Sequence, residues 1–394
     1  MYFCGIDIAK RKHVALILDS AGQPVKPAFA FDNSRSGFDQ LLAELQALTA
    51  PVTIGLEATG HYWLALYEAL VTHDHAVVVL NPLQVHAYQR SGLRKCKNDR
   101  TDAFWIADFV RIANLPATSR ELPVLLQLRE LARFRFWLTE QMGDCKRKVL
   151  CVLDRVFPEY ETLFSNVFLR SSQQLLAQAV TPQEFADFNL DELTRHLQAA
   201  SHGRLGRLQA EALQAAARQS VGVHFLADAV HVEMHCLLEQ IHLLDTQRQC
   251  VDQALTQLMA QLPQHLTSIP GIGPVTAAAI LAEIGDVQRF DSLDKLVGYA
   301  GIDATVYQSG QFEAQVAHMS KRGSAYLRHA LWLAASMAIQ HEPDLKSFYV
   351  RKRAEGKPHG VALGAVCRKL LARIYVVLKE QRPYTLRSIP DAET

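Results

Sequence analysis

The sequence lacks an excess of charge of either sign, any paired cysteine motif and any long apolar run. Its 41 Lys and Arg residues balance 40 Asp and Glu residues, so the net charge of +1 indicates neither a nucleic-acid nor a membrane partner. The seven scattered cysteines form no C-x-x-C pair, which argues against a disulfide framework or a cysteine-type zinc site. No stretch approaches the roughly 18 apolar residues of a membrane span, and Asp7 and Lys10 leave no room for an apolar signal segment. We therefore expect a cytoplasmic protein without a membrane partner.

The length of the chain predicts more than one domain. It has 394 residues, of which 49% are hydrophobic and 21% charged, an ordinary globular composition. Single hydrophobic cores stop growing at roughly 250 residues. Pattern changes along the chain predict an α/β domain at 1–115, a helical or coiled-coil region at 116–262 and a mostly helical C-terminal domain at 263–394.

The first 115 residues alternate between strand and helix patterns. A hairpin opens the chain, because two apolar strands flank the basic turn at residues 10–12. This order of elements predicts a mixed sheet with helices on it. Further strands are predicted at 27–32, 52–57 and 76–80, and helices at 38–48 and 61–72.

Four carboxylates in this domain have reasons to converge. Asp7 lies inside one apolar strand and Glu57 ends another, and burying a charge without a partner is costly. Asp99 and Asp102 are spaced i, i+3 at the start of a predicted helix, so both face one side of it. The alternative is that Asp99 caps the helix and Asp7 is a turn residue.

This set of carboxylates suits hard divalent cations. Mg²⁺ prefers carboxylate and phosphate oxygens, and two such ions roughly 3.5–4 Å apart can activate a nucleophile and stabilise a leaving oxygen in phosphoryl transfer. The sequence therefore predicts that the four acids bind Mg²⁺ together. Basic residues crowd the Asp99/Asp102 pair, as suits a polyanionic substrate: Arg90, Arg94, Lys95, Lys97 and Arg100.

Two long helices are predicted in the middle of the chain, at 122–156 and 224–262. In the second, apolar residues from Leu237 to Leu262 alternate in steps of four and three, a heptad seam interrupted once by Arg248. This spacing predicts a coiled coil or a long bundle helix. We expect the seam to bury against a partner helix of another subunit, with Arg248 setting the register; the alternative is a bundle within one chain. The intervening stretch at 165–220 is weakly helical and shows no chemical motif.

Two features of the C-terminal part indicate phosphate binding. Gly271 and Gly273 lie in a tight turn between apolar segments, a helix-hairpin-helix pattern whose backbone N–H groups can hold a phosphate. The alternative is a plain helix turn. From residue 320 to 373, 11 Lys and Arg residues stand against three acids, a local charge of +8. Such a basic face can neutralise phosphates, although a solvated helix face gives the same pattern.

The motifs GIDIAK, GLEATG and KNDRTDA resemble, in order and spacing, those of the DEDD transposases of the insertion-sequence-110 family. The resemblance covers about residues 1–156 and 263–375. It implies a RuvC-like, RNase H-type fold for the first domain, with the family's four acids at Asp7, Glu57, Asp99 and Asp102. The later matching segments are LRELARFRFWL, LTSIPGIGPVTAAAILAEIGDVQRF, YAGIDATVYQSG and MSKRGSAYLRHALWLAA.

The resemblance also implies a serine nucleophile in the C-terminal domain. We place it at Ser309, in a Gln-Ser-Gly context, with Ser320 as the competing position. Lys321, Arg322 and Arg328 follow closely in sequence and could hold the phosphate that the serine attacks.

The sequence thus predicts a transposase or recombinase that cuts and rejoins donor and target DNA. The resemblance further implies a structured bridge RNA that selects both DNAs by base pairing, and assembly as a homodimer or homotetramer. Two alternatives stay open: a RuvC-like nuclease that hydrolyses branched DNA with Ser309 as a bystander, and a non-enzymatic DNA-binding scaffold. The expected nucleic-acid contacts are Arg94, Lys95, Lys97, Arg100, Gly271, Gly273, Lys321, Arg322 and Arg328.

Overall fold

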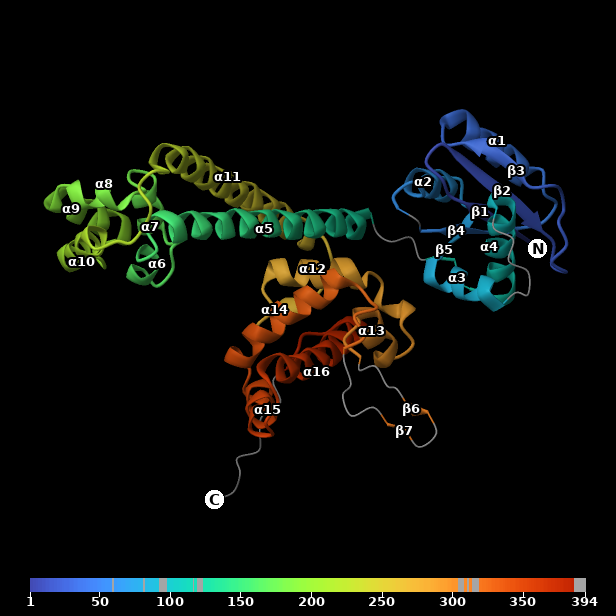
Figure 1. The fold of residues 1–394 in the computed structure, drawn as a ribbon. Helices are drawn as coiled ribbons and strands as arrows, with labels where there is room; N and C mark the ends of the chain where they lie inside the picture. The colour runs from blue at the N-terminus through green and yellow to red at the C-terminus, as the bar shows by residue number, and fades with distance from the viewer. Residues whose placement is uncertain are drawn as a thin grey trace, which may run out of the picture. The chain divides into compact units, whose positions relative to one another are not determined.

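Chain contacts divide the protein into two compact units, Met1–Leu122 and Pro123–Thr394, each with its own hydrophobic core. The domain boundaries predicted near residues 115 and 262 stay predictions. The structure is a computed structural model (Figure 1), and it describes residues 1–58, 60–80, 82–91, 98–115, 117–118, 123–303, 308–309, 312–313 and 319–385.

The first unit is built on a five-stranded mixed sheet in the order β3-β2-β1-β4-β5. The pairs β3–β2 and β2–β1 are antiparallel, whereas β1, β4 and β5 run parallel. Helices α1 and α2 cover one face and α4 covers the other, which buries the apolar strands on both sides. The predicted mixed sheet is therefore confirmed. Its strands are β1 (Tyr2–Asp7), β2 (Lys12–Leu18), β3 (Phe29–Asp32), β4 (Val52–Glu57) and β5 (Ala76–Leu80), and its helices are α1 (Arg35–Gln46), α2 (Leu64–Thr72), α3 (Pro82–Ser91) and α4 (Asp99–Ala113).

Two long helices, α5 (Pro123–Val156) and α11 (Ala227–Met259), run side by side through the second unit (Figure 1). Both predicted long helices are confirmed. One end of the pair shares a core with five short helices, of which α7–α10 occupy the stretch predicted as weakly helical. The other end shares a core with α12–α16. The short helices are α6 (Tyr160–Leu163), α7 (Arg170–Leu176), α8 (Pro182–Asp187), α9 (Leu190–Ser201) and α10 (Arg207–Arg218).

The apolar seam of α11 is filled from within the chain. Leu237 and Ile241 are buried in the core at one end of the helix, and Val251 and Leu255 in the core at the other. Because α5 carries its own apolar stripe and packs along α11, the structure gives this seam a partner helix from the same chain rather than from another subunit.

Arg248 interrupts the seam without being left unpaired. Its guanidinium bonds Asp245 at 2.6 Å and Asp252 at 3.5 Å along α11. Asp252 is also paired with Arg135 of α5, so one ion network crosses between the two helices. The bonds of Arg248 itself lie within α11, and Arg135–Asp252 is the pair that crosses. The register-setting role of Arg248 stays a prediction.

The C-terminal part of this unit is a cluster of helices around α14 and α16. Ser324 begins α14, because its Oγ accepts a hydrogen bond from Leu327 N at 3.1 Å. A short hairpin, β6 (Gln308–Ser309) and β7 (Phe312–Glu313), precedes it in the chain. The helices are α12 (Pro274–Ile284), α13 (Leu293–Ala300), α14 (Ala325–His341), α15 (Pro343–Ala354) and α16 (His359–Glu380), with 3-10 turns η1 (Leu266–Ser268) and η2 (Val287–Arg289).

The glycine turn before α12 differs from the expected hairpin between two helices. The element directly before the turn is the 3-10 turn η1 (Leu266–Ser268) rather than an α-helix. Gly271 has φ +91°, and a Cβ there would lie 2.5 Å from Ala338 N of α14. Its glycine is therefore required by backbone conformation and by packing against α14. Gly273, in contrast, is exposed at the start of α12 with open space around it.

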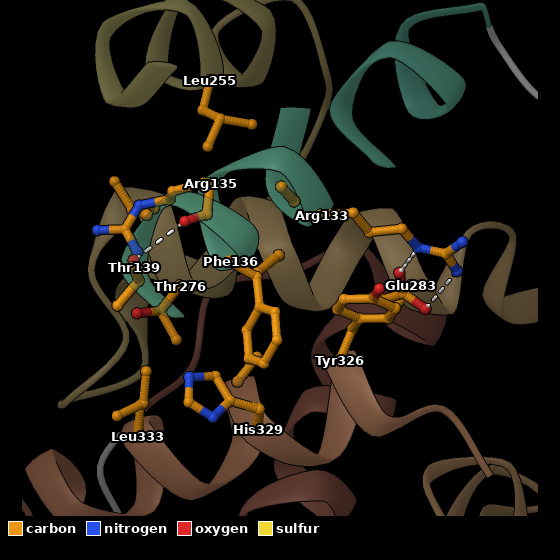
Figure 2. A pocket seen from close by; sticks show the side chains of 14 residues that line it. Arg133, Arg135, Phe136, Thr139, Leu255, Thr276, Glu283, Tyr326, His329 and Leu333 are labelled. Atoms are coloured by element: carbon orange, nitrogen blue, oxygen red, sulfur yellow. Dashed lines mark hydrogen bonds and ion pairs between the residues drawn. The ribbon is translucent and has the colours of Figure 1, made fainter. Parts of the chain in front are cut away.

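A buried carboxylate ties α5 to α12 and α14 (Figure 2). Glu283 on α12 is 1% exposed, and Arg133 of α5 donates to both of its oxygens, at 2.7 and 3.2 Å. Ser324 Oγ donates to Glu283 Oε2 at 2.7 Å, so the cap of α14 belongs to the same network. The Arg133 guanidinium also lies 4.8 Å from the ring centre of Tyr326. Together these bonds fix where α14 begins.

Replacing Glu283 by Ala is expected to destabilise the protein by about 1–3 kcal/mol, because it leaves the Ser324 hydroxyl and the partly exposed Arg133 guanidinium without their acceptor. The measurement is the shift of the thermal or urea transition of the purified protein. Glu239→Ala is the matched control, since Glu239 is an exposed glutamate on α11, and its effect should stay within about 0.5 kcal/mol. Equal shifts for the two variants would contradict the structural role of Glu283.

Candidate active site

Asp7 and Glu57 lie at the same edge of the sheet. They are the last residues of β1 and β4, which are adjacent and parallel with Ile6 opposite Leu56. Parallel neighbours end at the same edge, so the topology brings these two carboxylates together. The alternative interpretation of Asp7 as a turn residue is wrong, because Asp7 pairs with Val14 of β2 inside the sheet.

Helix α4 delivers the other two acids to this edge. It crosses the sheet at two glycines: a Cβ on Gly5 would lie 2.2 Å from Ala103 O, and one on Gly55 would lie 2.7 Å from Val110 Cγ2. Any side chain at Gly5 would push the helix away from β1. The close crossing places the first turn of α4, which contains Asp99 and Asp102, near the end of β1.

The start of α4 is capped by Asn98 rather than by Asp99. Asn98 Oδ1 accepts hydrogen bonds from the backbone N–H and the hydroxyl of Thr101, both at 2.8 Å. The alternative interpretation of Asp99 as the cap is therefore wrong, and its carboxylate is exposed. Asp102 is half-buried and accepts a hydrogen bond from Gln89 Nε2 of α3 at 3.2 Å.

The other three carboxylates act electrostatically on Asp7. Burial, and after it the charges of Asp102, Asp99 and Glu57 in that order, together raise the pKa of Asp7 to about 6. Mutual repulsion of this kind is relieved when a cation enters, and carboxylate oxygens are the donors that hard cations prefer. Within the described residues, however, no three acidic, histidine or cysteine side chains lie close enough to enclose a metal ion. The acids therefore form a loose cluster.

The basic residues expected beside this cluster are only partly described. Arg94, Lys95 and Lys97 lie outside the described residues, whereas Arg100 is exposed in the first turn of α4. The cluster and Arg100 lie on the same helical turn, so an anion at the cluster would meet a cation there.

The two candidate serines occupy different local structures. Ser309 ends β6, with its backbone paired to Phe312 of β7. Ser320 lies just before α14, where its hydroxyl donates to the Asp303 carboxylate and its backbone N–H donates to Asp303 O at 2.9 Å. Lys321 N donates to Gly301 O at 3.1 Å. These bonds join the two ends of the segment that carries Ser309.

Asp303 is a residue that the sequence patterns missed. It follows the apolar run that ends at Ile302, the same arrangement by which Asp7 and Glu57 were found. An acid directly after an apolar run is a pattern that could have indicated Asp303. Its hydrogen-bond partner Ser320 is 17 positions away, so only the fold shows that the two residues are bonded.

Several cations of the C-terminal basic region are already paired within the fold. Arg373 pairs with Glu342 and Asp344, Lys352 with Glu355, and Arg368 with Asp294. Others gather around one aromatic ring on α15: the charged groups of Arg351, Lys352 and Lys369 lie 5.3, 5.8 and 4.1 Å from the centre of Phe348. Part of the local charge of +8 is therefore neutralised by ion pairs within the fold, and part of it belongs to the cations around Phe348.

Comparisons with known proteins identify the class to which this fold and acidic cluster belong. A DEDD transposase model of the IS110 family matches residues 4–158, and a model of the IS116/IS110/IS902 transposase family matches residues 263–350. The chain therefore belongs to the IS110 family of transposases, enzymes that cut and rejoin DNA. The DEDD domain implies dependence on a divalent metal ion. In the described residues, every helix is too short or too polar to cross a membrane.

Relatives match along nearly the whole chain. The "Mini-circle putative transposase for IS117" of Streptomyces coelicolor is 26% identical over 404 residues, covering 97% of this chain and 95% of the relative. The pilin gene-inverting protein of Moraxella bovis is 25% identical over 389 residues, covering 98% of each chain. The transposase for insertion sequence element IS1111A of Coxiella burnetii is 30% identical over 124 residues, 31% of this chain and 34% of its own.

Proposed function

We propose that this transposase cuts and rejoins the DNA of an insertion sequence with Mg²⁺ held by Asp7, Glu57, Asp99 and Asp102, and with Ser309 as the nucleophile. The observation that carries the proposal is that Asp102, Asp99 and Glu57 all act on the charge of Asp7 at one edge of a RuvC-like sheet. These acids come from two strands and one helix, and their negative charges repel one another. A bound cation would offset this repulsion.

The residues divide the chemistry between them. Mg²⁺ at the acids would polarise the scissile phosphate and favour the deprotonated serine. Ser309 Oγ gives up its proton and forms a bond to phosphorus, and the bond from phosphorus to one deoxyribose oxygen breaks. Lys321, Arg322 and Arg328 follow the serine in sequence and offset the charge that develops on the phosphate. Attack by the released strand end or its partner on the phosphoserine then restores the serine hydroxyl.

Nucleic-acid partners complete the proposal. Donor and target DNA are the substrates, and a structured bridge RNA selects them by base pairing, as the family resemblance implies. Exposed Gly273 at the start of α12 and the cations around Phe348 are available to phosphates of either nucleic acid. The protein acts as a homodimer or homotetramer, in which the serine of one subunit can meet the acids of the same or another subunit.

A two-plasmid assay in cells tests the function. The intact protein, supplied with the DNA that flanks its own gene, should yield joined donor–target products, and the Glu57→Ala protein should yield none. Free cleaved ends without joined products would favour the hydrolytic nuclease. Binding without any cleavage would favour the scaffold.

Sequencing of RNA that copurifies with the protein should recover one structured species, and its absence would remove the bridge RNA from the proposal.

A further inference from the structure

A groove of about 780 Å³ lies between α14 and α16. Its volume is within the range of roughly 300–1,000 Å³ that holds small ligands. One end of the groove is lined by Ile302, Asp303, Met319 and Lys321, which flank the segment that carries Ser309. The groove therefore opens beside the place where that segment leaves and rejoins the helical core.

The floor of the groove is apolar and unusually bare on the α16 side. Gly360 and Gly364 lie one helical turn apart, and a Cβ on them would meet only Trp332 Cη2 at 3.8 Å and Met319 Cε at 3.4 Å. Glycine inside a helix costs stability relative to alanine, so two on one face call for a reason. Here they leave one side of the Trp332 indole and of the Met319 side chain lining the groove, while both residues also pack against the hydrophobic core.

The rim of the groove is cationic. Lys321, Arg328 and Arg368 line it together with one acid, Asp303, which already accepts the Ser320 hydroxyl. Arg328 Nη1 donates to Ala300 O at 3.2 Å, which holds the guanidinium at the rim. Among the described residues, neither Lys321 nor Arg328 forms an ion pair with a carboxylate. An occupant of this groove should therefore carry negative charge at one end.

The backbone at Lys321 has a conformation that suits glycine better than lysine. Its φ is +52°, a left-handed conformation that favours glycine. Glycines do occupy similar positions nearby, at Gly301 with φ +65°. Glycine would fit this position with less strain, so Lys321→Gly is a substitution that removes the ammonium group without a cost in backbone conformation.

We propose that this groove holds one unpaired nucleotide of the DNA strand, with its base against Trp332 and Met319 and its phosphate at Lys321 and Arg328. A base offers the flat apolar face that the floor matches, and the adjoining phosphate offers the charge that the rim matches. The inference rests on the proposed function. DNA is the occupant we choose because the groove lies beside the segment that carries Ser309, the proposed DNA-attacking nucleophile. A nucleotide must leave its base pair to enter the groove. Holding it there would fix which phosphate of the DNA lies near the serine.

Binding by the Ser309→Ala protein tests the groove without cleavage. The probe is a single-stranded DNA octamer, followed by fluorescence anisotropy and by intrinsic tryptophan emission. Trp332 should be quenched, so the quenching should disappear in the Trp332→Phe protein, which keeps a ring for stacking, whereas the affinity of the Trp332→Ala protein should fall roughly tenfold. Gly364→Leu should fill the groove and lower affinity at least as much. Gly298→Leu is the matched control, since Gly298 lies in α13 with open space around it, and its affinity should equal that of the parent.

A second variant separates binding from folding. Lys321→Gly relieves the left-handed strain, so its melting temperature should be equal or higher while its affinity for the octamer falls and the salt dependence of binding decreases by about 0.7 in log–log slope. Unchanged affinity in both Gly364→Leu and Lys321→Gly would overturn the proposal. Equal or tighter binding of an RNA octamer of the same sequence, with the same quenching of Trp332, would overturn DNA as the occupant. Adduct formation by the protein with Ser309 intact reports separately on the proposed function.

Discussion

The Asp7→Asn protein should lose strand cleavage by more than about 100-fold and yet melt at a higher temperature in metal-free buffer above pH 6. The first effect follows from losing a metal ligand. The second follows from the pKa of Asp7, which burial and three neighbouring carboxylates raise from 3.8 to about 6. Between these values the folded state binds more protons than the unfolded state, so stability falls as pH rises through this window.

The expected gain for Asp7→Asn is on the order of 1–3 kcal/mol at pH 7.5, and it should vanish as pH falls toward 4. Differential scanning fluorimetry measures it. Added Mg²⁺ should raise the melting temperature of the unaltered protein and leave that of Asp7→Asn unchanged, since a ligand stabilises only the state that binds it. Asp39→Asn is the control, because Asp39 is exposed on α1 and paired with Arg35. A Mg²⁺ response of Asp7→Asn equal to that of the control would count against the shared metal site.

The Ser309→Ala protein should form no covalent adduct with nicked DNA, a loss of more than about 10⁴-fold, because removal of a nucleophile abolishes the covalent step. Ser320→Ala should still form the adduct, more slowly. Its hydroxyl donates to Asp303 and joins the two ends of the Ser309 segment, and removing the donor leaves a half-buried carboxylate unsatisfied at a cost of about 1–3 kcal/mol. Denaturing gels with labelled DNA measure both.

Ser320→Thr provides the matched control, because it keeps the hydroxyl and should restore the rate of adduct formation. Loss of the adduct in Ser320→Ala alone, with Ser309→Ala fully active, would move the nucleophile to Ser320. Adducts absent from every protein, with cleaved ends still produced, would return the hydrolytic nuclease to first place.

Sequence patterns determined most of what is local in this protein. Apolar runs predicted the strands that carry Asp7 and Glu57, although β1 ends at Asp7 rather than continuing past it, and helical spacing predicted α5 and α11 nearly to their bounds. Spacing of i, i+3 placed Asp99 and Asp102 on one helical turn. These features depend on neighbours within a few residues, and backbone geometry fixes how such neighbours lie.

The sequence was least informative where the deciding partner is distant. The seam around Arg248 was expected to face a second subunit, but α5, about 100 positions earlier, supplies the facing stripe. At Gly271 the sequence could not show that Ala338 on α14 leaves no room for a side chain, and its phosphate contact stays a prediction. In both cases the local pattern indicates that another part of the chain packs closely there. It does not indicate which part.

What the sequence by itself determined is therefore the chemistry available: four acids, a serine candidate and the motifs that resemble one transposase family. Only the tertiary structure decided how these groups are placed. The close crossing of α4 at Gly5 brings Asp102 to Asp7, Ser320 meets Asp303, and Glu283 fixes the start of α14. The groove under Trp332 likewise exists only because α14 and α16 pack together. The physical reason is that burial and charge act through space, and residues far apart in the chain set both.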